Sequence, residues 1–254
     1  MFDMQSRAKL SVAENDNFKN ELPIETSKPN PVIRQNLLPM CSYSDEVKAL
    51  GLTQKTCEDL GIGFLSYGRS PLRGRVIMQV RDAHFTKDQT KRKEAVLSHI
   101  GLPDQDNPDY WVYPGFNVKL DLLGQERFWL DKETKRQTVE HNSIILTDDP
   151  LGSARAFQYG IRNIVSTLGT SPSTAHIDQL IQMAKECDVN QIILVFNRVS
   201  HSQVKAFSKL GIQFSTFDWE QKFPSKGRGY LSIPATITCL SEFYKDQLLS
   251  LIHI

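Results

Sequence analysis

The amino-acid sequence predicts an α/β protein in which a smaller α+β subdomain precedes a mostly parallel four-stranded sheet flanked by helices. Two patterns and the composition predict this class. Short apolar runs alternate with helical segments from residue 143 onwards, and one strand-like alternation starts near residue 75. With 254 residues, of which 40% are hydrophobic and 23% charged, the chain is long enough to bury a core without disulfides.

Charge, hydropathy and cysteine spacing exclude several classes of protein. The formal net charge of +1 excludes a globally basic nucleic-acid coat, although a local basic patch is compatible with it. No run approaches the roughly 20 continuous apolar residues of a membrane span, and residues 1–18 lack the apolar segment of a secretory signal. We therefore expect a cytoplasmic protein with no membrane partner. None of the four cysteines lies in a C-x-x-C pair, so no zinc site is expected.

The first 140 residues divide into a predicted leader and a predicted subdomain. Residues 1–40 are polar and contain four prolines, which is typical of an extended or disordered leader. Residues 41–140 form the α+β subdomain, which begins with a helical hairpin. Its strand RVIMQV places three apolar residues on one face, namely Val76, Met78 and Val80.

The predicted parallel sheet occupies residues 141–220. Four apolar runs with helices between them predict its strands: SIILT, NIV, QIILVF and IQFSTF. Sites in such sheets lie beyond the carboxyl ends of the strands. These ends are Asp148 and Asp149, the turn 168–170, Asn197 and Arg198, and Asp218. Residues 221–254 are expected to form a loop and an amphipathic helix, which packs on the domain or docks a partner.

Two segments of the subdomain have a composition that suits nucleic acid. Residues 69–93 hold eight Lys and Arg against two Asp, so they form either a polyanion-binding face or a solvated charged loop. Residues 102–119 contain four aromatic side chains, which either pack under a long loop or stack on bases.

The pair Asp148-Asp149 is the best candidate for chemistry. Carboxylates at a strand end suit a divalent cation or acid/base catalysis, but an aspartate before Pro150 can equally cap the next helix. Taken alone, the pair favours the cap. Dinucleotide-binding, P-loop and hydrolase nucleophile motifs are absent from the sequence.

Six strings occur in an order and spacing typical of one family. They are LGIGF (60–64), LRGRV (72–76), PDYWVYPG (108–115) followed by Lys119, QYGI (158–161), TLGT (167–170) and AHIDQLI (175–181). In these strings the chain resembles the catalytic core of bacterial DnaG-type DNA primases, which has the toprim fold. The resemblance covers roughly residues 43–217.

The resemblance implies a magnesium or manganese site with degenerate ligands. Asp148 falls on the catalytic glutamate of the family, and Asp149 falls on the glycine that follows it. The Asp-x-Asp motif of the family falls on Asn197-Arg198-Val199, which leaves Asp148, Asp149 and Asn197 as the metal-site positions. Asn197 offers an uncharged oxygen, Val199 offers no ligand, and Arg198 repels a cation, so metal binding should be weak or absent.

Three functions remain open at this stage. The leading hypothesis is a primase-related toprim protein that binds single-stranded DNA with lost or weak catalysis, through Arg73, Arg75, Arg81 and Lys119. One alternative is an active DNA primase that synthesises RNA primers with a rearranged site including Asp218. The other is a protein-binding scaffold of a mobile element or replication complex, which would bind a replication protein through the C-terminal helix.

Overall fold

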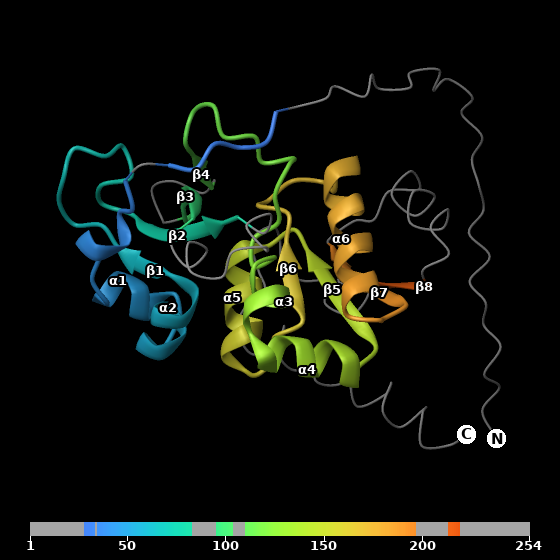
Figure 1. Cartoon of the computed structure of the whole chain (residues 1–254). Helices are drawn as coiled ribbons and strands as arrows, with labels where there is room; N and C mark the ends of the chain where they lie inside the picture. Colours follow the sequence, from blue (N-terminus) through green and yellow to red (C-terminus); the bar gives the residue numbers. More distant parts are fainter. Residues whose placement is uncertain (1–27, 34, 83–94, 104–109, 197–212, 219–254) are drawn as a thin grey trace.

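The computed structural model describes residues 28–33, 35–82, 95–103, 110–196 and 213–218 (Figure 1). In these ranges the chain forms two sheets that lie side by side. The first part comprises η1 (Leu38–Met40), α1 (Asp45–Ala49), α2 (Gln54–Leu60), β1 (Ile62–Phe64), β2 (Val76–Arg81), β3 (Val96–Gly101) and β4 (Trp111–Val112). The second part comprises α3 (Arg127–Leu130), α4 (Lys132–Glu140), β5 (Ser143–Thr147), α5 (Pro150–Gln158), β6 (Ile164–Ser166), α6 (Thr174–Glu186), β7 (Gln191–Phe196) and β8 (Gln213–Asp218).

The first sheet is antiparallel, with the order β1-β2-β3-β4. The alternation in β2 sends Val76, Met78 and Val80 into one apolar cluster, as predicted, whereas Ile77 packs in another on the opposite face. Both faces of β2 are therefore covered. The two-residue period of a strand explains why neighbouring residues enter different clusters.

Part of the predicted leader packs against this sheet. Leu37 is buried in the same cluster as Ile77, and the backbone N–H of Ile33 donates to the carbonyl of Val96 at 2.9 Å. Residues 28–33 and 35–40 therefore belong to the packed body, while residues 1–27 lie outside the described ranges.

The second sheet has the order β6-β5-β7-β8, and every pair in it is parallel. The strands and the helices α5 and α6 follow the alternation predicted from residue 143, so the α/β class is confirmed. The helix predicted between β7 and β8, at residues 202–210, lies outside the described residues.

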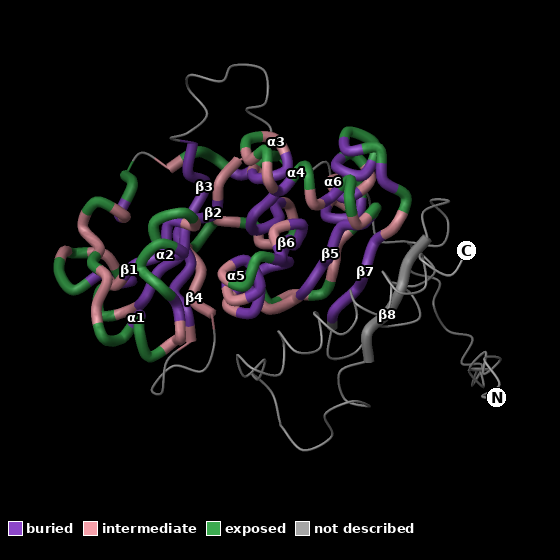
Figure 2. The backbone as a smooth tube through the Cα atoms, turned by 90° about the horizontal axis from the view of Figure 1, so that it is seen from below, coloured by how far each residue is buried: buried purple, intermediate pink, exposed green. Residues whose placement is uncertain are grey.

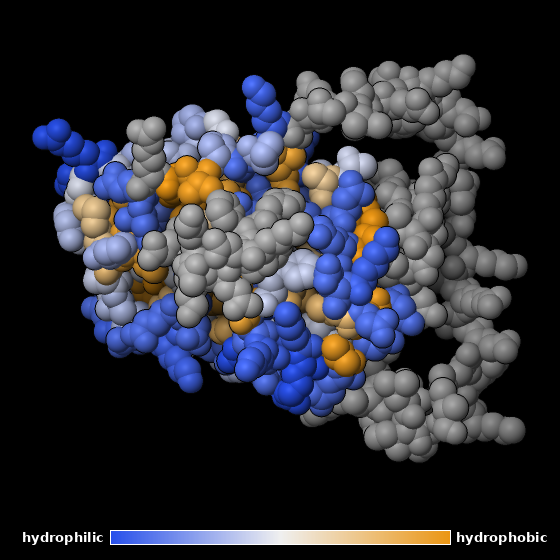
Figure 3. All heavy atoms as spheres, in the orientation of Figure 1, coloured by the Kyte–Doolittle hydropathy of each residue, from blue (hydrophilic) through white to orange (hydrophobic). Residues whose placement is uncertain are grey.

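Helices cover both faces of this parallel sheet. Ile144 and Leu146 of β5 pack in one cluster with Ile177 and Leu180 of α6 and with Phe128 of α3. α5 lies on the other face, between the two sheets (Figures 1 and 2). In Figure 3 the outer surface over α4 and α6 is mostly hydrophilic, as expected of helices that turn their apolar sides to a sheet.

The two sheets share one apolar cluster. It combines Val76 and Ile100 of the antiparallel sheet with Ala154 of α5 and Leu168 after β6. Polar contacts reinforce this junction, because the guanidinium of Arg155 in α5 donates two bonds, of 2.9 and 3.1 Å, to the carbonyl of Leu50, after α1. The sheets are therefore parts of one packed body in the described ranges.

In the ranges that the structure describes, no helix is both long and apolar enough to cross a membrane.

Candidate functional site

The acidic pair lies at the carboxyl end of β5, as its position in the sequence predicts. β5 ends at Thr147, and α5 begins at Pro150, so Asp148 and Asp149 form the strand-to-helix turn. Both side chains are half-buried. Burial raises the pKa of Asp148 to about 6, and the neighbouring charge of Asp149 raises it in the same direction.

Asp149 is bound by a tyrosine from the other sheet. It occupies the N-cap position of α5, but its side chain makes no capping bond there. Its Oδ1 instead accepts a hydrogen bond of 2.9 Å from the hydroxyl of Tyr110, which in turn accepts from the N–H of Leu151 at 3.3 Å. The side-chain capping interpretation is therefore wrong for Asp149.

Tyr110 is held in place as a neutral donor. Burial, and then the charge of Asp149, raise the pKa of its phenol well above the ordinary value. Its ring packs on Gly169, where an added Cβ would lie 3.2 Å from the ring, and Gly169 has a φ of 79°. The N–H of Thr167 also donates to the carbonyl of Thr147 at 2.9 Å. The ends of β5 and β6 therefore meet at Tyr110.

The other strands of the sheet end at the same edge. Thr147 pairs with Val195, and Phe196 pairs with Asp218, the last residue of β8. β5 and β8 are separated by β7, which places their backbones about 10 Å apart. Asn197, the predicted ligand after β7, lies outside the described residues. Within the described part of the chain, no group of three or more His, Cys, Asp or Glu side chains could hold a metal ion.

Arg73 and Arg75 lie in the turn that leads into β2. Arg73 is exposed, whereas the stem of Arg75 lies on Gly101 of β3. An added Cβ at Gly101 would come within 2.9 Å of Arg75 Cδ, so only glycine leaves room for this side chain. The Nη1 atom of Arg75 is buried and has no hydrogen-bond partner among the described residues. A buried guanidinium nitrogen without a protein acceptor leaves one donor for a water molecule or an anion.

The other two predicted nucleic-acid residues lie elsewhere. Arg81 is the last residue of β2, about 20 Å along the strand from Arg75, and its guanidinium donates to Oε1 of Gln79 at 3.0 and 3.2 Å. Lys119 is exposed, and its carbonyl accepts from Ser173 Oγ at 2.5 Å, at the N-terminus of α6. Arg73 and Arg75 thus share one turn, and Arg81 lies at the opposite end of the strand.

The aromatic segment around β4 connects the basic turn with the acidic strand end. Trp111 pairs with Gly101 and packs, like Tyr113, on the cluster that contains Leu72 of the basic turn. Tyr110 packs with the cluster on the other side and reaches Asp149. The strand period therefore lets consecutive aromatic side chains contact two different sites. Local sequence pattern does not reveal the contact between Tyr110 and Asp149, because the two residues are 39 positions apart.

Comparison with known proteins finds similarity only among solved structures. No protein-family model matches the sequence, and no curated protein matches it. The RNA polymerase domain of Mycobacterium tuberculosis primase DnaG, in complex with a double-stranded DNA oligomer with a 6-nucleotide overhang, superposes with a TM-score of 0.52 and 14% identity, over 81% of this chain and 74% of that one. The DnaG primase catalytic domain bound to single-stranded DNA superposes with a TM-score of 0.50 and 17% identity, over 78% of this chain and 70% of that one.

The zinc-binding and RNA polymerase domains of the Aquifex aeolicus primase give a TM-score of 0.51 and 18% identity, over 82% of this chain. The fold resembles the DnaG primase catalytic core. The resemblance predicted from the sequence strings is therefore confirmed at the level of fold. The chain spans 54% of the length of the Aquifex aeolicus structure, so it is similar to only a part of that protein.

Proposed function

We propose that this protein binds single-stranded DNA through its basic turn and has lost most or all primer synthesis. The observation that carries the binding proposal is a basic turn on a primase-like fold, in which the exposed Arg73 lies beside the half-buried Arg75. Phosphate contacts require only cationic side chains, so binding can persist after catalysis is lost. The sequence predicts residues 41–140 as the primase-core-like subdomain and residues 141–220 as the toprim-like domain. In this proposal α3 and α4 belong with the toprim-like domain, because Phe128 of α3 packs in the core of the parallel sheet.

The acidic strand end supports the loss of catalysis. Its two adjacent carboxylates do not make a complete magnesium site, because Asp149 already accepts from Tyr110 and no third carboxylate joins them within the described ranges. In the sequence, Asn197 and Val199 stand where the related family has two aspartates. Phosphoryl transfer depends on charge neutralisation by the metal, so a weak or empty site should abolish most activity.

DNA binding is tested by fluorescence anisotropy on a single-stranded oligonucleotide over a range of salt concentrations. We expect the double variant Arg73→Gln/Arg75→Gln to weaken binding and to reduce the log–log salt slope by about 1.4, because each lost phosphate contact removes about 0.7. The matched control is Lys132→Gln/Lys135→Gln, which removes the same charge from the exposed side of α4. Equal slopes for the two double variants would contradict the binding proposal.

Metal binding and catalysis are tested separately. Calorimetric titration with Mg²⁺ or Mn²⁺ should show weak or no binding, and a primer-synthesis assay on single-stranded DNA should show little or no product. Adding carboxylates through Asn197→Asp/Arg198→Gly/Val199→Asp should tighten metal binding, because two negative charges are added and one positive charge is removed.

An active primase with a rearranged site is the second candidate. It is favoured by Asp148, whose pKa is raised to about 6 at a strand end that shares its edge with the end of β8, at Asp218. Millimolar or tighter metal binding that disappears in Asp148→Ala, together with primer synthesis by the unmodified protein, would replace the first proposal with this one. The scaffold alternative concerns the predicted C-terminal helix, which lies outside the described residues.

A further inference from the structure

A cavity of about 390 Å³ opens beside the basic turn, on the antiparallel sheet. Three segments that are distant in the sequence form it: the chain before and within η1, the loop after β1, and the residue that follows β4. Its lining consists of Gln35, Leu37, Met40, Leu65, Tyr67, Gly68, Arg69, Ser70 and Tyr113. A cavity of this volume is large enough for one planar ring system with an attached sugar.

The chemistry of the lining suits a ligand with a flat ring and an anionic group attached to it. Leu37 and Leu65 are buried, and Tyr67 and Tyr113 add aromatic surface. Tyr67 is 57% exposed, so a large aromatic face is open to solvent in the absence of a ligand. Arg69 is the one charged residue among these nine described residues, and none of them is acidic. An anion would therefore meet no carboxylate in the lining.

The wall around Tyr113 is already ordered. Its hydroxyl and the hydroxyl of Ser70 share a hydrogen bond of 2.6 Å, and its ring packs edge-on against Trp111 with centroids 4.9 Å apart. Ser70 Oγ also accepts from the N–H of Leu72 at 3.2 Å. The side chains of Tyr113 and Ser70 are therefore already fixed before a ligand enters the cavity. This lowers the entropic cost of binding.

The same loop carries the predicted phosphate contacts. The carbonyl of Ser70 accepts from the N–H of Arg73 at 3.0 Å, so the cavity wall and the basic turn are hydrogen-bonded to one another. A nucleotide held in the cavity would have cationic side chains of Arg69 at its edge and of Arg73 in the adjoining turn.

We propose that this cavity receives one unpaired nucleobase of a single strand, which stacks on Tyr67 while Arg69 and Arg73 contact the neighbouring phosphates. This inference rests on the proposed single-strand binding and names the base-binding part of that interface. Stacking on tyrosine is tolerant of sequence because every base has a π face. The protein should therefore distinguish a strand with bases from a bare sugar–phosphate strand.

The test compares Tyr67→Ala with Tyr159→Ala. Tyr159, at the end of α5, is 51% exposed and is therefore a matched control for the loss of an exposed tyrosine. On a single-stranded oligonucleotide, Tyr67→Ala should raise Kd by about 5- to 160-fold, while Tyr159→Ala leaves it unchanged. Tyr67→Phe should keep the affinity of the unmodified protein, because the ring and not the hydroxyl makes the contact. The salt slope should be the same for all three variants.

Two further measurements separate this inference from the proposed function. An abasic strand of the same length should bind the unmodified protein more weakly than the normal strand, and equal binding would overturn base insertion. A normal strand carrying 2-aminopurine should change its fluorescence on binding to the unmodified protein and not to Tyr67→Ala. If Tyr67→Ala binds like the unmodified protein with a normal salt slope, the inference fails and DNA binding stands. If the unmodified protein binds no single strand at low salt, both fail.

Discussion

The antiparallel and parallel sheets are both buried on their two faces, but different structures cover them. Helices α3, α5 and α6 cover the parallel sheet, and all five residues of β5 are buried. One face of the antiparallel sheet is covered by irregular chain, from residues 35–40 and 65–72, and the cavity lies in this cover. In this molecule the cavity lies in the irregular cover of the antiparallel sheet, whereas the candidate acidic site lies at the strand ends of the helix-covered parallel sheet.

Buried polar groups show the same difference. In the antiparallel sheet, Asn36 of the irregular cover accepts from Gln79 at 2.6 Å and contacts His99 Nε2 at 3.2 Å. In the parallel sheet, Asn163 donates to the carbonyl of Ser143 at 2.9 Å, at the beginning of its strand. The irregular cover is thus attached both through the apolar cluster of Leu37 and Ile77 and through polar side chains that reach the sheet.

The largest expected effect tests whether the two sheets unfold together. Phe128 and Ile77 are fully buried in different clusters, on the parallel and the antiparallel sheet. Phe128→Ala should lower the free energy of unfolding by about 3–5 kcal/mol and Ile77→Ala by about 2–5 kcal/mol. Because the sheets share a third cluster, urea unfolding should remain a single transition in circular dichroism and tryptophan fluorescence. Two separated transitions would show that the sheets are independent.

Acid should destabilise both regions through one buried histidine in each. Burial lowers the pKa of His99 on β3 and of His176 on α6 to about 4. The unfolded chain takes up these protons near pH 6.5, so stability falls as the pH drops from about 6.5 to about 4, by about 2–3 kcal/mol per histidine. Asp148 acts in the opposite sense, because its raised pKa stabilises the folded protein as the pH falls through about 6. Urea midpoints at pH 7, 5 and 4 measure the sum.

The variants His99→Gln and His176→Gln show whether the loss of stability in acid comes from the antiparallel-sheet region or from the parallel-sheet region. Each should reduce the loss of stability between pH 7 and pH 4, because the unfolded state of the variant has one proton fewer to bind. A pH dependence that is the same in both variants as in the unmodified protein would mean that other groups cause the acid sensitivity.

A smaller effect is expected at the contact between the two regions. Tyr110→Phe removes the hydroxyl that binds Asp149 and Leu151, and should lower the free energy of unfolding by about 1–2 kcal/mol. The control Tyr43→Phe removes a bond of 2.8 Å to the neutral carbonyl of Leu52 within the first region. A hydrogen bond to a charged acceptor is stronger, so the Tyr110 variant should be the less stable of the two in urea unfolding. A larger loss of unfolding free energy for Tyr43→Phe than for Tyr110→Phe would show that the bond to Asp149 contributes less than a neutral hydrogen bond.

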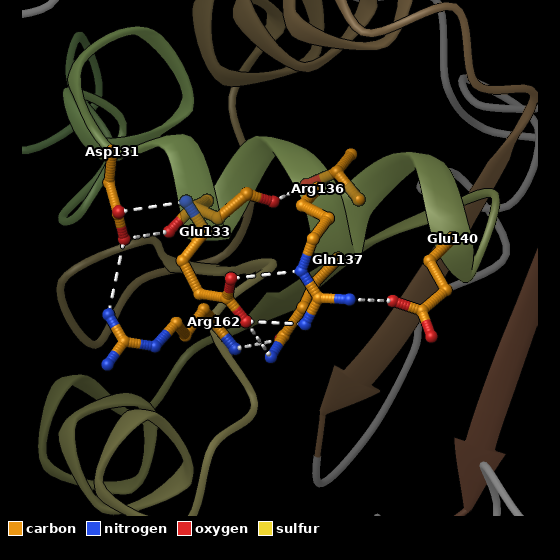
Figure 4. A network of polar contacts seen from close by, with 8 residues as sticks. Asp131, Glu133, Arg136, Gln137, Glu140 and Arg162 are labelled. Atoms are coloured by element: carbon orange, nitrogen blue, oxygen red, sulfur yellow. Dashed lines mark hydrogen bonds and ion pairs between the residues drawn. The ribbon is translucent and has the colours of Figure 1, made fainter.

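The smallest effects concern the polar network on α4 and its neighbour Arg162 (Figure 4). Arg162 contacts Asp131 at 3.3 Å and lies 4.4 Å from the ring centroid of Phe157, with 28% of its side chain exposed. Arg162→Ala should lower the free energy of unfolding by about 1 kcal/mol. Arg136 makes shorter ion pairs of 2.7 Å with Glu133 and Glu140, but its side chain is 60% exposed.

Arg136→Ala should change thermal stability less than Arg162→Ala, since solvent and salt screen exposed pairs. Thermal unfolding of both variants in low and high salt measures this difference. A larger loss for Arg136→Ala would show that ion-pair distance outweighs burial in the helical cover.

Local pattern in the sequence predicts the strands of the parallel sheet, the helical hairpin of α1 and α2, and β2. The run QIILVF coincides with β7, and the alternation of Val76, Met78 and Val80 agrees with their shared cluster. The position of Asp148 and Asp149 at a strand end also follows from the sequence, because a strand ends where its apolar run ends. These features depend on residues within one turn or one strand of each other, and periodicity records such neighbours directly.

The sites depended on the tertiary structure. Tyr110 and Asp149 come from different sheets, and the cavity combines residues from three segments between Gln35 and Tyr113. The sequence separates Arg75 from Arg81 by only five residues, yet a fully extended strand places them about 20 Å apart. Proximity in the chain therefore did not predict a shared surface.

By itself the sequence determined the fold class, the alternation of strands and helices from residue 143 onwards and the acidic strand end, because those are local properties. It did not predict β1, β3, α3 or α4. Only the tertiary structure decided which distant side chains meet, because packing of two sheets around α5 brings them together.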